Sequence, residues 1–478
     1  MSERLDENIF LSQEILSAIG AELIVEGAGA FSAIATDTRK DNGGKLFFAL
    51  KGETYDAHDY LEKALESGAT GLVVERVSDT ALELAKKQQV TIFKVSQTLK
   101  ALQDLALFWR KKLDPKVVAI TGSNGKTTTK EFAAQIASEK YKTLYSKGSF
   151  NNHFGVPLSL LELRPHHEVV IQEMGMNHPG EIKELVQMTD PDIVLVTTVG
   201  RAHLEGLGSL EAIALAKEEI YQWARPAAIR IVNMDNPYTR SMRDRFPKES
   251  SVVTFSSHES SVDVQLKEVV SKLEFMELSG IIGGEPEGVK VEVFGRQNLN
   301  NLMAAAAVGL ACGLEPDLVW RGLKKCKTVW GRNQILKTDS GAKVIFDAYN
   351  ANPDSVSALV ENVSRLNVSG KRVAILGEML EMGGHSDSVH EEVGEKIGEG
   401  QYDIVWFVGP SRESFERGLR KNNFQKSLYI SNSYDEDIAT KIQSVLQAGD
   451  IVLIKGSRGM KLERVLEQWK LVGFGSKD

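Results

Sequence analysis

Apolar and polar positions follow three successive patterns along the chain. Over residues 1–113, short apolar runs such as 45–50 and 70–74 alternate with amphipathic segments, which predicts a small α/β domain. Over 114–331, apolar β-branched runs alternate with amphipathic helical stretches, a pattern typical of a parallel sheet covered on both faces. A second alternating series over 332–478 predicts a Rossmann-like domain. We therefore expect an α/β protein of three domains.

The apolar runs also predict the individual strands. In the second stretch they cover 117–121, 168–172, 193–197 and 229–232. In the third they cover 343–346, 372–376, 404–408, 427–430 and 451–454, each followed by a helical segment. Residues 251–295 are rich in β-branched residues and glycine, which predicts an antiparallel extension before a helix over 298–313.

Composition narrows the class of protein. The 478 residues exceed the size of a single core, in keeping with about three domains. The 57 Lys and Arg against 65 Asp and Glu give a net charge of −8, which provides no general attraction to nucleic acid or anionic lipid. Two cysteines, Cys312 and Cys326, support neither a disulfide scaffold nor a thiolate metal site. Without a signal-peptide pattern or a membrane-spanning apolar run, the sequence predicts a cytoplasmic protein.

The order of residues 117–131, Val-Val-Ala-Ile-Thr-Gly-Ser-Asn-Gly-Lys-Thr-Thr-Thr-Lys-Glu, indicates phosphate binding. A predicted strand is followed by a glycine turn and then by a helix over 126–139, whose first N–H groups would cradle a polyphosphate. Lys126 would reach the terminal phosphates, and the Thr127 hydroxyl would hold Mg²⁺. The turn is shorter than the usual phosphate loop, but incidental glycines would not require Lys-Thr directly after them. The nucleotide contacts predicted here come from Gly122, Ser123, Asn124, Gly125, Lys126, Thr127 and Thr128.

Polar residues after two further strands could complete a metal site. Glu173 follows the strand over 168–172, and His203 lies in the turn after the strand over 193–197, at the sheet edge where ligands bind in α/β proteins. Glu173 could coordinate Mg²⁺ or could be an ordinary capping or surface residue. His203 could ligate a metal or orient a phosphate, although a lone histidine is more often structural. Lys217 belongs to a Lys-Glu-Glu run, which by itself indicates a solvated helix face.

Basic residues recur at turns in the third stretch. Arg332 follows a glycine, and Lys455-Gly-Ser-Arg458-Gly follows the last strong strand. The second cluster could be an anion-binding loop or a solubilising turn. No Gly-x-Gly-x-x-Gly follows the first strand of this stretch, so dinucleotide redox chemistry lacks its main signature.

Four segments together resemble the Mur ligase family over nearly the whole chain. They are the shortened Thr-Gly-Ser-Asn-Gly-Lys-Thr-Thr loop, the Glu-Met-Gly-Met-Asn strand end, the Val-Gly-Arg-Ala-His-Leu-Glu turn and the later Lys-Glu-Glu. Three others are similar to the members that join D-alanyl-D-alanine to UDP-N-acetylmuramoyl-tripeptide: Asp-Ala-Tyr-Asn-Ala-Asn-Pro-Asp-Ser (347–355), Leu-Gly-Glu-Met-Leu-Glu-Met-Gly (376–383), and Thr-Asp-Thr-Arg (36–39) with 46–52. Members that add single amino acids, or glutamates to folate, differ at 349–353.

The resemblance implies an ATP-dependent amide ligase that forms an acyl phosphate, the last cytoplasmic peptide-adding step of peptidoglycan precursor synthesis. It implies ATP, Mg²⁺ as two ions, and a carbamylated Lys217. The catalytic residues implied are Lys126, His203 and Lys217, and the metal ligands are Thr127, Glu173, His203 and Lys217. Further nucleotide contacts are implied for Asn298, Asn301, Arg332, Asp347, Tyr349 and Asn350.

The same resemblance implies where the substrates bind. Residues 1–113 would hold the UDP-sugar, 114–331 the ATP, and 332–478 the D-alanyl-D-alanine. The substrate contacts implied are Asp37, Thr38, Arg39, Asn151, Asn152, Asn352, Lys455, Ser457 and Arg458. The protein is expected to be a monomer that binds no nucleic acid and does not insert into membranes, and its third domain is expected to close on ATP binding.

Two other classes of protein are alternatives to this interpretation. A P-loop kinase or GTPase switch would also bind nucleotide, but no guanine-specifying Asn-Lys-x-Asp occurs and the third domain would be unexplained. A regulator that only binds nucleotide would not need Glu173, His203 and Lys217 together. The sequence does not indicate whether the tripeptide ends in lysine or diaminopimelate.

Overall fold

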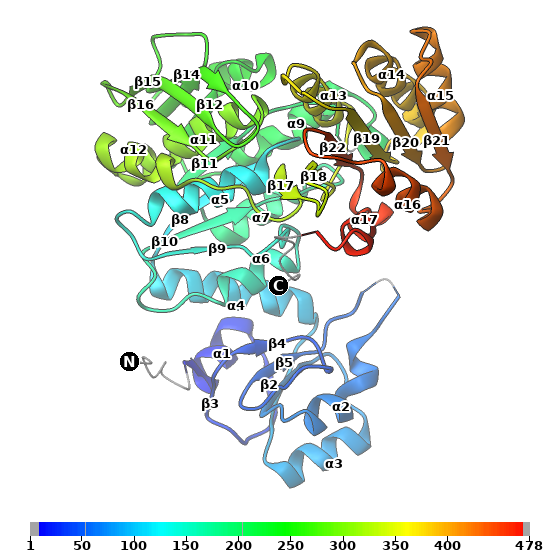
Figure 1. The fold of residues 1–478 in the computed structure, drawn as a ribbon. Helices are drawn as coiled ribbons and strands as arrows, with labels where there is room; N and C mark the ends of the chain where they lie inside the picture. Colours follow the sequence, from blue (N-terminus) through cyan, green and yellow to red (C-terminus); the bar gives the residue numbers. More distant parts are fainter. Residues whose placement is uncertain (1–8, 53, 203, 472–478) are drawn as a thin grey trace. The chain divides into compact units, whose positions relative to one another are not determined.

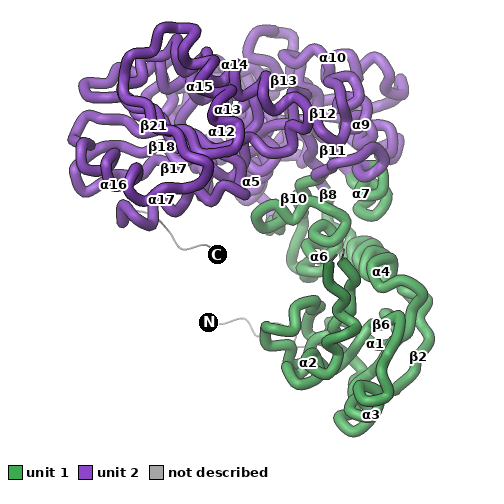
Figure 2. The backbone as a smooth tube through the Cα atoms, turned by 90° about the vertical axis from the view of Figure 1, so that its right-hand side faces the viewer, with its two compact units in different colours: residues 1–117, 142–174, 183–191 green, residues 118–141, 175–182, 192–478 purple. Residues whose placement is uncertain are grey.

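A computed structural model describes residues 9–52, 54–202 and 204–471. The chain forms two compact units (Figure 2). Unit 1 consists of residues 1–117, 142–174 and 183–191, and unit 2 of residues 118–141, 175–182 and 192–478. The substrate-based domain boundaries near 114 and 332 stay predictions.

Unit 1 contains a five-stranded sheet in the order β2-β7-β6-β5-β4 (Figure 1). Its strands are β2 (Glu22–Val25), β4 (Ile34–Ala35), β5 (Leu46–Phe48), β6 (Gly71–Val74) and β7 (Thr91–Lys94). All neighbours are parallel except β2 and β7. Side chains alternate across β5, so that Leu46 and Phe48 join one buried cluster while Phe47 joins another on the opposite face. Burial on both faces explains the continuous apolar run.

Helices and short strands complete unit 1. The helices are α1 (Ser12–Ile19), η1 (Ala57–Tyr60), α2 (Leu61–Glu66), α3 (Asp79–Gln88), α4 (Thr98–Leu113) and α6 (Gly155–Leu160). β1 (Phe10–Leu11) pairs with β3 (Ala30–Phe31), and β9 (Thr143–Tyr145) pairs in parallel with β10 (Val169–Glu173). α7 (Glu181–Thr189) lies at a boundary between the units in the sequence.

The first sheet of unit 2 runs β16-β15-β14-β13-β12-β11-β8. Its strands are β8 (Lys116–Thr121), β11 (Ile193–Val196), β12 (Ile229–Asn233), β13 (Val252–Ser256), β14 (Val264–Ser271), β15 (Met276–Ile282) and β16 (Glu285–Val291). The antiparallel extension expected over 251–295 is wrong for β13, which pairs in parallel with both β12 and β14. Only β14, β15 and β16 are antiparallel. A helical connection before β13 lets it enter the sheet as a parallel strand.

The helices of this part of unit 2 are α5 (Lys126–Ala137), α8 (Leu204–Leu207), α9 (Leu210–Gln222), α10 (Pro237–Met242), η2 (Arg243–Arg245), α11 (Gln297–Cys312) and α12 (Pro316–Lys325). α5 and α11 pack closely, because a Cβ on Gly309 of α11 would lie 2.8 Å from Ile136 Cγ2 of α5. Cys312 and Cys326 are both buried and not disulfide-bonded.

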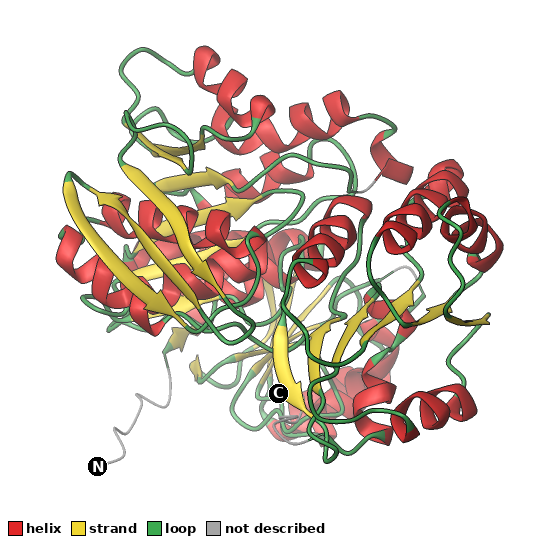
Figure 3. Cartoon of the chain, turned by 45° about the horizontal axis from the view of Figure 1, so that its top comes forward, coloured by secondary structure: helices red, strands yellow, loops and turns green. Residues whose placement is uncertain are grey.

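The second sheet of unit 2 runs β17-β18-β22-β19-β20-β21. Its strands are β17 (Gln334–Lys337), β18 (Lys343–Asp347), β19 (Arg372–Gly377), β20 (Ile404–Val408), β21 (Ser427–Ser431) and β22 (Ile451–Lys455). The five predicted strands are confirmed as parallel neighbours, and the antiparallel edge strand β17 adds to them. Figure 3 shows helices on both sides of the sheet: α13 (Pro353–Ser364), η3 (Gly383–His385), α14 (Ser386–Glu399), α15 (Arg412–Lys421), α16 (Glu436–Ser444), η4 (Arg458–Met460) and α17 (Glu463–Gln468).

Among the helices of the described residues, none combines the length and the apolar composition needed to cross a membrane.

Candidate functional site

The turn between β8 and α5 fits tightly against its neighbours. Gly122 has φ 150° and Gly125 has φ 83°, both in the region that favours glycine. A Cβ at Gly122 would lie 1.9 Å from Thr197 Oγ1, and one at Gly125 would lie 2.2 Å from Asn301 Oδ1. Any larger residue would therefore push the turn away from β11 or α11. No side chain caps the start of α5, which leaves its first turn available for a ligand anion.

Hydrogen bonds hold this turn, the phosphate loop (residues 122–127), against the segment after β11. Ser123 Oγ donates to the Gly200 carbonyl and accepts from the Gly200 N–H, both at 2.9 Å. Thr197 Oγ1 donates to the Asn124 carbonyl at 2.6 Å. The Lys126 ammonium lies over the loop and donates to the Gly122 carbonyl at 2.8 Å. The loop is thus fixed by hydrogen bonds to residues 197–200, and Lys126 is hydrogen-bonded within the loop.

Arg332 brings a positive charge to the phosphate loop from the start of the third predicted domain. Its Nη2 donates to Thr127 Oγ1 at 3.1 Å, and its guanidinium carbon lies 4.4 Å from the centre of the Tyr349 ring. Its Nε is buried with no hydrogen-bond partner among the described residues. A half-buried guanidinium with an unbonded Nε beside a phosphate loop is suited to an incoming phosphate oxygen.

Two asparagines at the start of α11 lie beside the loop, and their contacts with a nucleotide stay predictions. Asn301 Oδ1 accepts from Thr129 Oγ1 of α5 at 3.3 Å, and its Nδ2 donates to Asn298 Oδ1 at 2.9 Å. Asn298 in turn donates to the Phe294 carbonyl at 2.8 Å. The two side chains therefore form one buried network behind Gly125.

The structure pairs Lys455 with Asp347. The Lys455 ammonium lies 2.6 Å from Asp347 Oδ2 and also donates to the Asn350 carbonyl at 3.1 Å. The other carboxylate oxygen of Asp347 accepts from the Asn333 N–H. Lys455 is buried and paired, so it is not the exposed cation of a solubilising turn, and its contact with a substrate stays a prediction.

The neighbouring predicted substrate contacts are also bonded within the chain. Ser457 Oγ accepts from the Leu380 N–H at 2.9 Å, and Arg458 Nη1 lies 2.5 Å from Glu463 Oε1. Asn352 caps α13 by accepting from the Ser355 N–H at 2.9 Å. Its amide group donates to Asn124 Oδ1 of the phosphate loop at 2.7 Å. Their roles toward a substrate stay predictions.

Lys217 is a buried lysine of α9. It lies in α9 with 1% of its surface exposed, and no hydrogen bond or ion pair joins it to the described residues. Burial, and secondarily the positive charge of Lys126, hold the pKa of Lys217 well below its ordinary value. Glu218 is also buried and is bound by Arg245 at 2.5 and 2.8 Å. The interpretation of Lys-Glu-Glu as a solvated face is therefore wrong for Lys217, whose ammonium form is disfavoured by burial.

In unit 1, Glu173 ends β10 with 1% of its surface exposed. Its Oε1 accepts from Asn151 Nδ2 at 2.8 Å, whereas its Oε2 is buried with no partner in the part of the chain described. An unpaired buried carboxylate oxygen is costly, and a hard cation is a suitable partner for it. Asn152 Oδ1 accepts from the N–H groups of Phe154 and Gly155 at the start of α6.

Two observations bear on the predicted metal ligands. His203 lies outside the described residues. Within residues 9–52, 54–202 and 204–471, no group of three or more His, Cys, Asp or Glu side chains could hold a metal ion.

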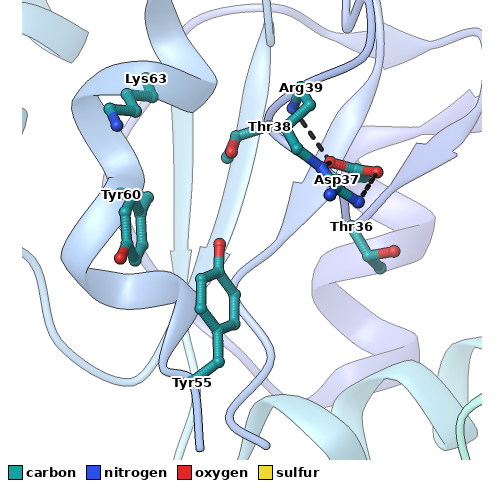
Figure 4. A pocket seen from close by; sticks show the side chains of 7 residues that line it. All are labelled: Thr36, Asp37, Thr38, Arg39, Tyr55, Tyr60 and Lys63. Atoms are coloured by element: carbon teal, nitrogen blue, oxygen red, sulfur yellow. Dashed lines mark hydrogen bonds and ion pairs between the residues drawn. The ribbon is translucent and has the colours of Figure 1, made fainter.

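A cavity of about 540 Å³ opens in unit 1 (Figure 4). It is lined by Thr36, Asp37, Thr38, Arg39, Tyr55, Tyr60 and Lys63. Arg39 binds Asp37 through two contacts of 2.9 Å, and this hydrogen bonding lowers the pKa of Asp37 to about 2. Tyr55 and Tyr60 stack with ring centres 5.0 Å apart, and the Lys63 ammonium lies 5.1 Å from the centre of the Tyr60 ring. The cavity thus offers aromatic faces and two cations to a ligand with a planar ring and an anionic group.

Sequence reasoning found Asp37, Thr38 and Arg39 but missed the opposite wall of this cavity. Tyr55, Tyr60 and Lys63 lie within nine residues of one another around η1. Their only signal in the sequence was the close spacing of two tyrosines and a lysine.

We expect the buried Lys217 to reduce stability at neutral pH. Below the ordinary lysine pKa of 10.5 the unfolded chain carries a proton that the folded chain binds poorly, so stability rises with pH between the lowered pKa and 10.5. In CO₂-free buffer, Lys217→Met should be more stable than the parent at pH 7, on the order of 1–3 kcal/mol. Denaturant midpoints should show a smaller difference at pH 9.5 than at pH 7. A difference independent of pH, or a less stable variant, would contradict a buried neutral amine.

Comparison with known proteins agrees with this geometry. Three family models match the chain: "Mur ligase family, catalytic domain" over residues 30–110, "Mur ligase middle domain" over 120–309, and "Mur ligase, glutamate ligase domain" over 331–458. The chain is 33% identical to the UDP-N-acetylmuramoyl-tripeptide–D-alanyl-D-alanine ligase of Bacillus subtilis, over 91% of this chain and 92% of that protein. It is 34% identical to the Escherichia coli ligase of the same name, with the same coverage.

Solved structures show the same similarity. A crystal structure of MurF from Acinetobacter baumannii superposes with a TM-score of 0.87 at 28% identity, covering 97% of this chain and all of the other. MurF ligase from Thermotoga maritima in complex with ADP superposes with a TM-score of 0.79 at 29% identity, covering 92% of this chain and 97% of the other. The chain belongs to the Mur ligase family.

Proposed function

We propose that the chain is a cytoplasmic, ATP-dependent ligase that joins D-alanyl-D-alanine to UDP-N-acetylmuramoyl-tripeptide. The main support is a phosphate loop that accepts hydrogen bonds from Arg332 and Asn352, two residues of the Rossmann-like part of the chain. A nucleotide switch would have no need for this second sheet. The names of relatives that share a third of their residues over nine-tenths of the chain support the choice of substrates.

The proposed reaction makes an amide from a carboxylate, which is a poor acyl donor. The tripeptide carboxylate attacks the γ-phosphorus of ATP, which forms an acyl phosphate and releases ADP. The dipeptide amine then attacks the acyl carbon, loses a proton, and expels inorganic phosphate. Lys126 and the N–H groups of the loop neutralise charge on the transferred group, which is the main task of the protein in phosphoryl transfer. Asn298, Asn301, Arg332, Asp347, Tyr349 and Asn350 would complete the nucleotide site.

The proposed metal ligands are Thr127, Glu173, His203 and a carbamate on Lys217. Bound Mg²⁺, as two ions, would neutralise phosphate charge during transfer. Support comes from the unpaired Oε2 of Glu173 and from the lowered pKa of Lys217. Only a neutral amine adds CO₂, and the product is an anion with two oxygens in place of a cation that would repel Mg²⁺.

The substrates are proposed to bind to different parts of the chain. The UDP portion would occupy the cavity of unit 1 through Asp37, Thr38 and Arg39, with Asn151 and Asn152 contacting the same substrate. The dipeptide would contact Asn352, Lys455, Ser457 and Arg458 of the third domain. This domain would close on ATP binding, and the protein would act as a monomer. Turnover on lysine- and diaminopimelate-containing tripeptides would identify the preferred third residue.

The direct test measures phosphate release from ATP. We expect release only when UDP-N-acetylmuramoyl-tripeptide and D-alanyl-D-alanine are both present, with one phosphate for each pentapeptide formed. Lys126→Ala should lower turnover by about 10²–10³-fold, as loss of a transition-state donor does, with an unchanged melting temperature. Lys87→Ala, at an exposed position of α3, serves as the control. Release that is independent of the dipeptide, or near-normal turnover without Lys126, would refute the proposal.

A second test addresses the carbamate. Lys217→Ala should lose nearly all activity, and formate or acetate should restore part of it by supplying carboxylate oxygens in the space left by the side chain. The parent enzyme should gain nothing from the same acids. Full activity of the variant without added acid would exclude an essential carbamate.

A third test addresses the cavity of unit 1. Arg39→Met should raise KM for the UDP-linked substrate about tenfold, as loss of a charged hydrogen bond does, while kcat stays unchanged because the role proposed for Arg39 is to bind the UDP portion and not the reacting groups. Arg76→Met provides the control, since Arg76 pairs with Asp56 and Asp59 and does not line the cavity. An unchanged KM would place the UDP portion elsewhere.

A further inference from the structure

Arg201, in the turn after β11, forms ion pairs with carboxylates from two helices that cover the second sheet of unit 2. Its Nε lies 2.9 Å from Asp354 Oδ1, and its backbone N–H donates to Asp354 Oδ2 at 2.8 Å. Its two terminal nitrogens lie 2.7 and 3.0 Å from the two oxygens of Glu392. Asp354 is in the first turn of α13 and Glu392 is in α14. Asp354 lies 153 residues after Arg201 in the sequence, and Glu392 lies 191 residues after it. The guanidinium of Arg201 thus joins two helices that are distant from it along the chain.

This clamp, formed by Arg201, Asp354 and Glu392, is continuous with the phosphate loop. A Cβ on Gly200 would lie 2.6 Å from Asp354 Oδ2, so the turn and the start of α13 are in close contact. On its other side Gly200 exchanges two hydrogen bonds with Ser123. The start of α13 is therefore linked to the loop by two routes, one through Gly200 and one through the cap residue Asn352, which binds Asn124.

The clamp is partly open to solvent. The side chains of Arg201, Asp354 and Glu392 are 30%, 37% and 35% exposed. The hydrogen bonds that Arg201 donates to Glu392 lower the pKa of Glu392, and those that Glu392 and Asp354 accept from it raise the pKa of Arg201. Bidentate geometry makes such pairs stronger than ordinary surface ion pairs, yet partial exposure leaves them sensitive to salt.

We propose that Arg201 is a positioning residue that fastens the start of α13 to the phosphate loop. The segment just before this helix carries Tyr349 and Asn350, which belong to the proposed nucleotide site, so the inference rests on that site. The clamp raises the fraction of molecules in which both halves of the site are docked before the nucleotide arrives, and closure on ATP binding docks the remainder. Without it, part of the binding free energy is spent on docking them, and the apparent Kd rises in inverse proportion to the docked fraction.

The test measures the affinity of the full chain for an ATP analogue with a methylene bridge between the β and γ phosphorus atoms. Calorimetry with Mg²⁺ is carried out at 50 mM and 500 mM NaCl. We expect Arg201→Met to bind about tenfold more weakly than the parent at low salt, and the ratio of the two Kd values to fall below about threefold at high salt. Arg420→Met is the matched control and should bind like the parent, because Arg420 pairs with Glu416 inside α15.

Glu392→Gln separates positioning from a general folding defect. This single change should weaken binding less than Arg201→Met, and the double variant should bind no more weakly than Arg201→Met alone. Melting temperatures should stay close to that of the parent. An unchanged Kd for Arg201→Met, a ratio that does not depend on salt, or additive effects in the double variant would each overturn the inference.

Because this experiment measures binding and not ligation, it does not depend on which substrates are joined. A parent chain that binds the analogue but fails to ligate would refute the proposed reaction and leave the clamp supported. A parent chain that does not bind the analogue would overturn both the nucleotide site and the clamp.

Discussion

The architecture of the site depends on how closely the turn after β8 approaches its neighbours. Gly122 and Gly125 leave no room for side chains against Thr197 and Asn301. The turn can therefore keep its shape only while the end of β11 and the start of α11 stay in place. Arg201 lies in the turn after β11, and Asn298 lies in the first turn of α11. Further along the chain after β11, α9 carries Lys217. One steric constraint thus ties the phosphate loop to the segments that carry Arg201, Asn298 and Asn301.

Two buried lysines of unit 2, Lys455 and Lys217, differ in whether a carboxylate neutralises them. Lys455 is buried against Asp347 and is satisfied, so it stabilises the junction of β18 and β22. Lys217 is equally buried but has no carboxylate partner among the described residues, and its ammonium form is disfavoured. A protein keeps an unpaired buried lysine at a cost in stability, which indicates a functional reason for it. Addition of CO₂ would supply that reason, since it converts the amine into a metal-binding anion.

The sequence predicted the fold well where strands are buried on both faces. The runs that became β8, β11, β12, β18, β19, β20 and β22 were found because nearly all of their residues are buried on both faces. The edge strand β21 was found from its short apolar run, although its residues are half-buried or exposed. β13 was assigned to an antiparallel extension because its β-branched run alone cannot show which neighbour it pairs with. β17 was missed because it is short and half-buried at an edge.

The candidate site was less visible than the fold. The phosphate loop was found because its glycines and Lys-Thr pair are contiguous, whereas the wall of Tyr55, Tyr60 and Lys63 has no such pattern. A charge run predicted a solvated Lys217, since only the packing of α9 reveals its burial. Lys455 and Asp347 lie 108 residues apart, so their pairing could not be inferred from either segment. The roles of all these residues toward ligands stay predictions.

The central claim is that the chain activates a peptide carboxylate by phosphorylating it. The most direct measurement uses UDP-N-acetylmuramoyl-tripeptide labelled with ¹⁸O in its terminal carboxylate, together with ATP and D-alanyl-D-alanine. The account predicts that each inorganic phosphate released carries one ¹⁸O, because the bridging oxygen of the acyl phosphate leaves with the phosphate. Unlabelled phosphate, or labelled AMP with pyrophosphate, would contradict it.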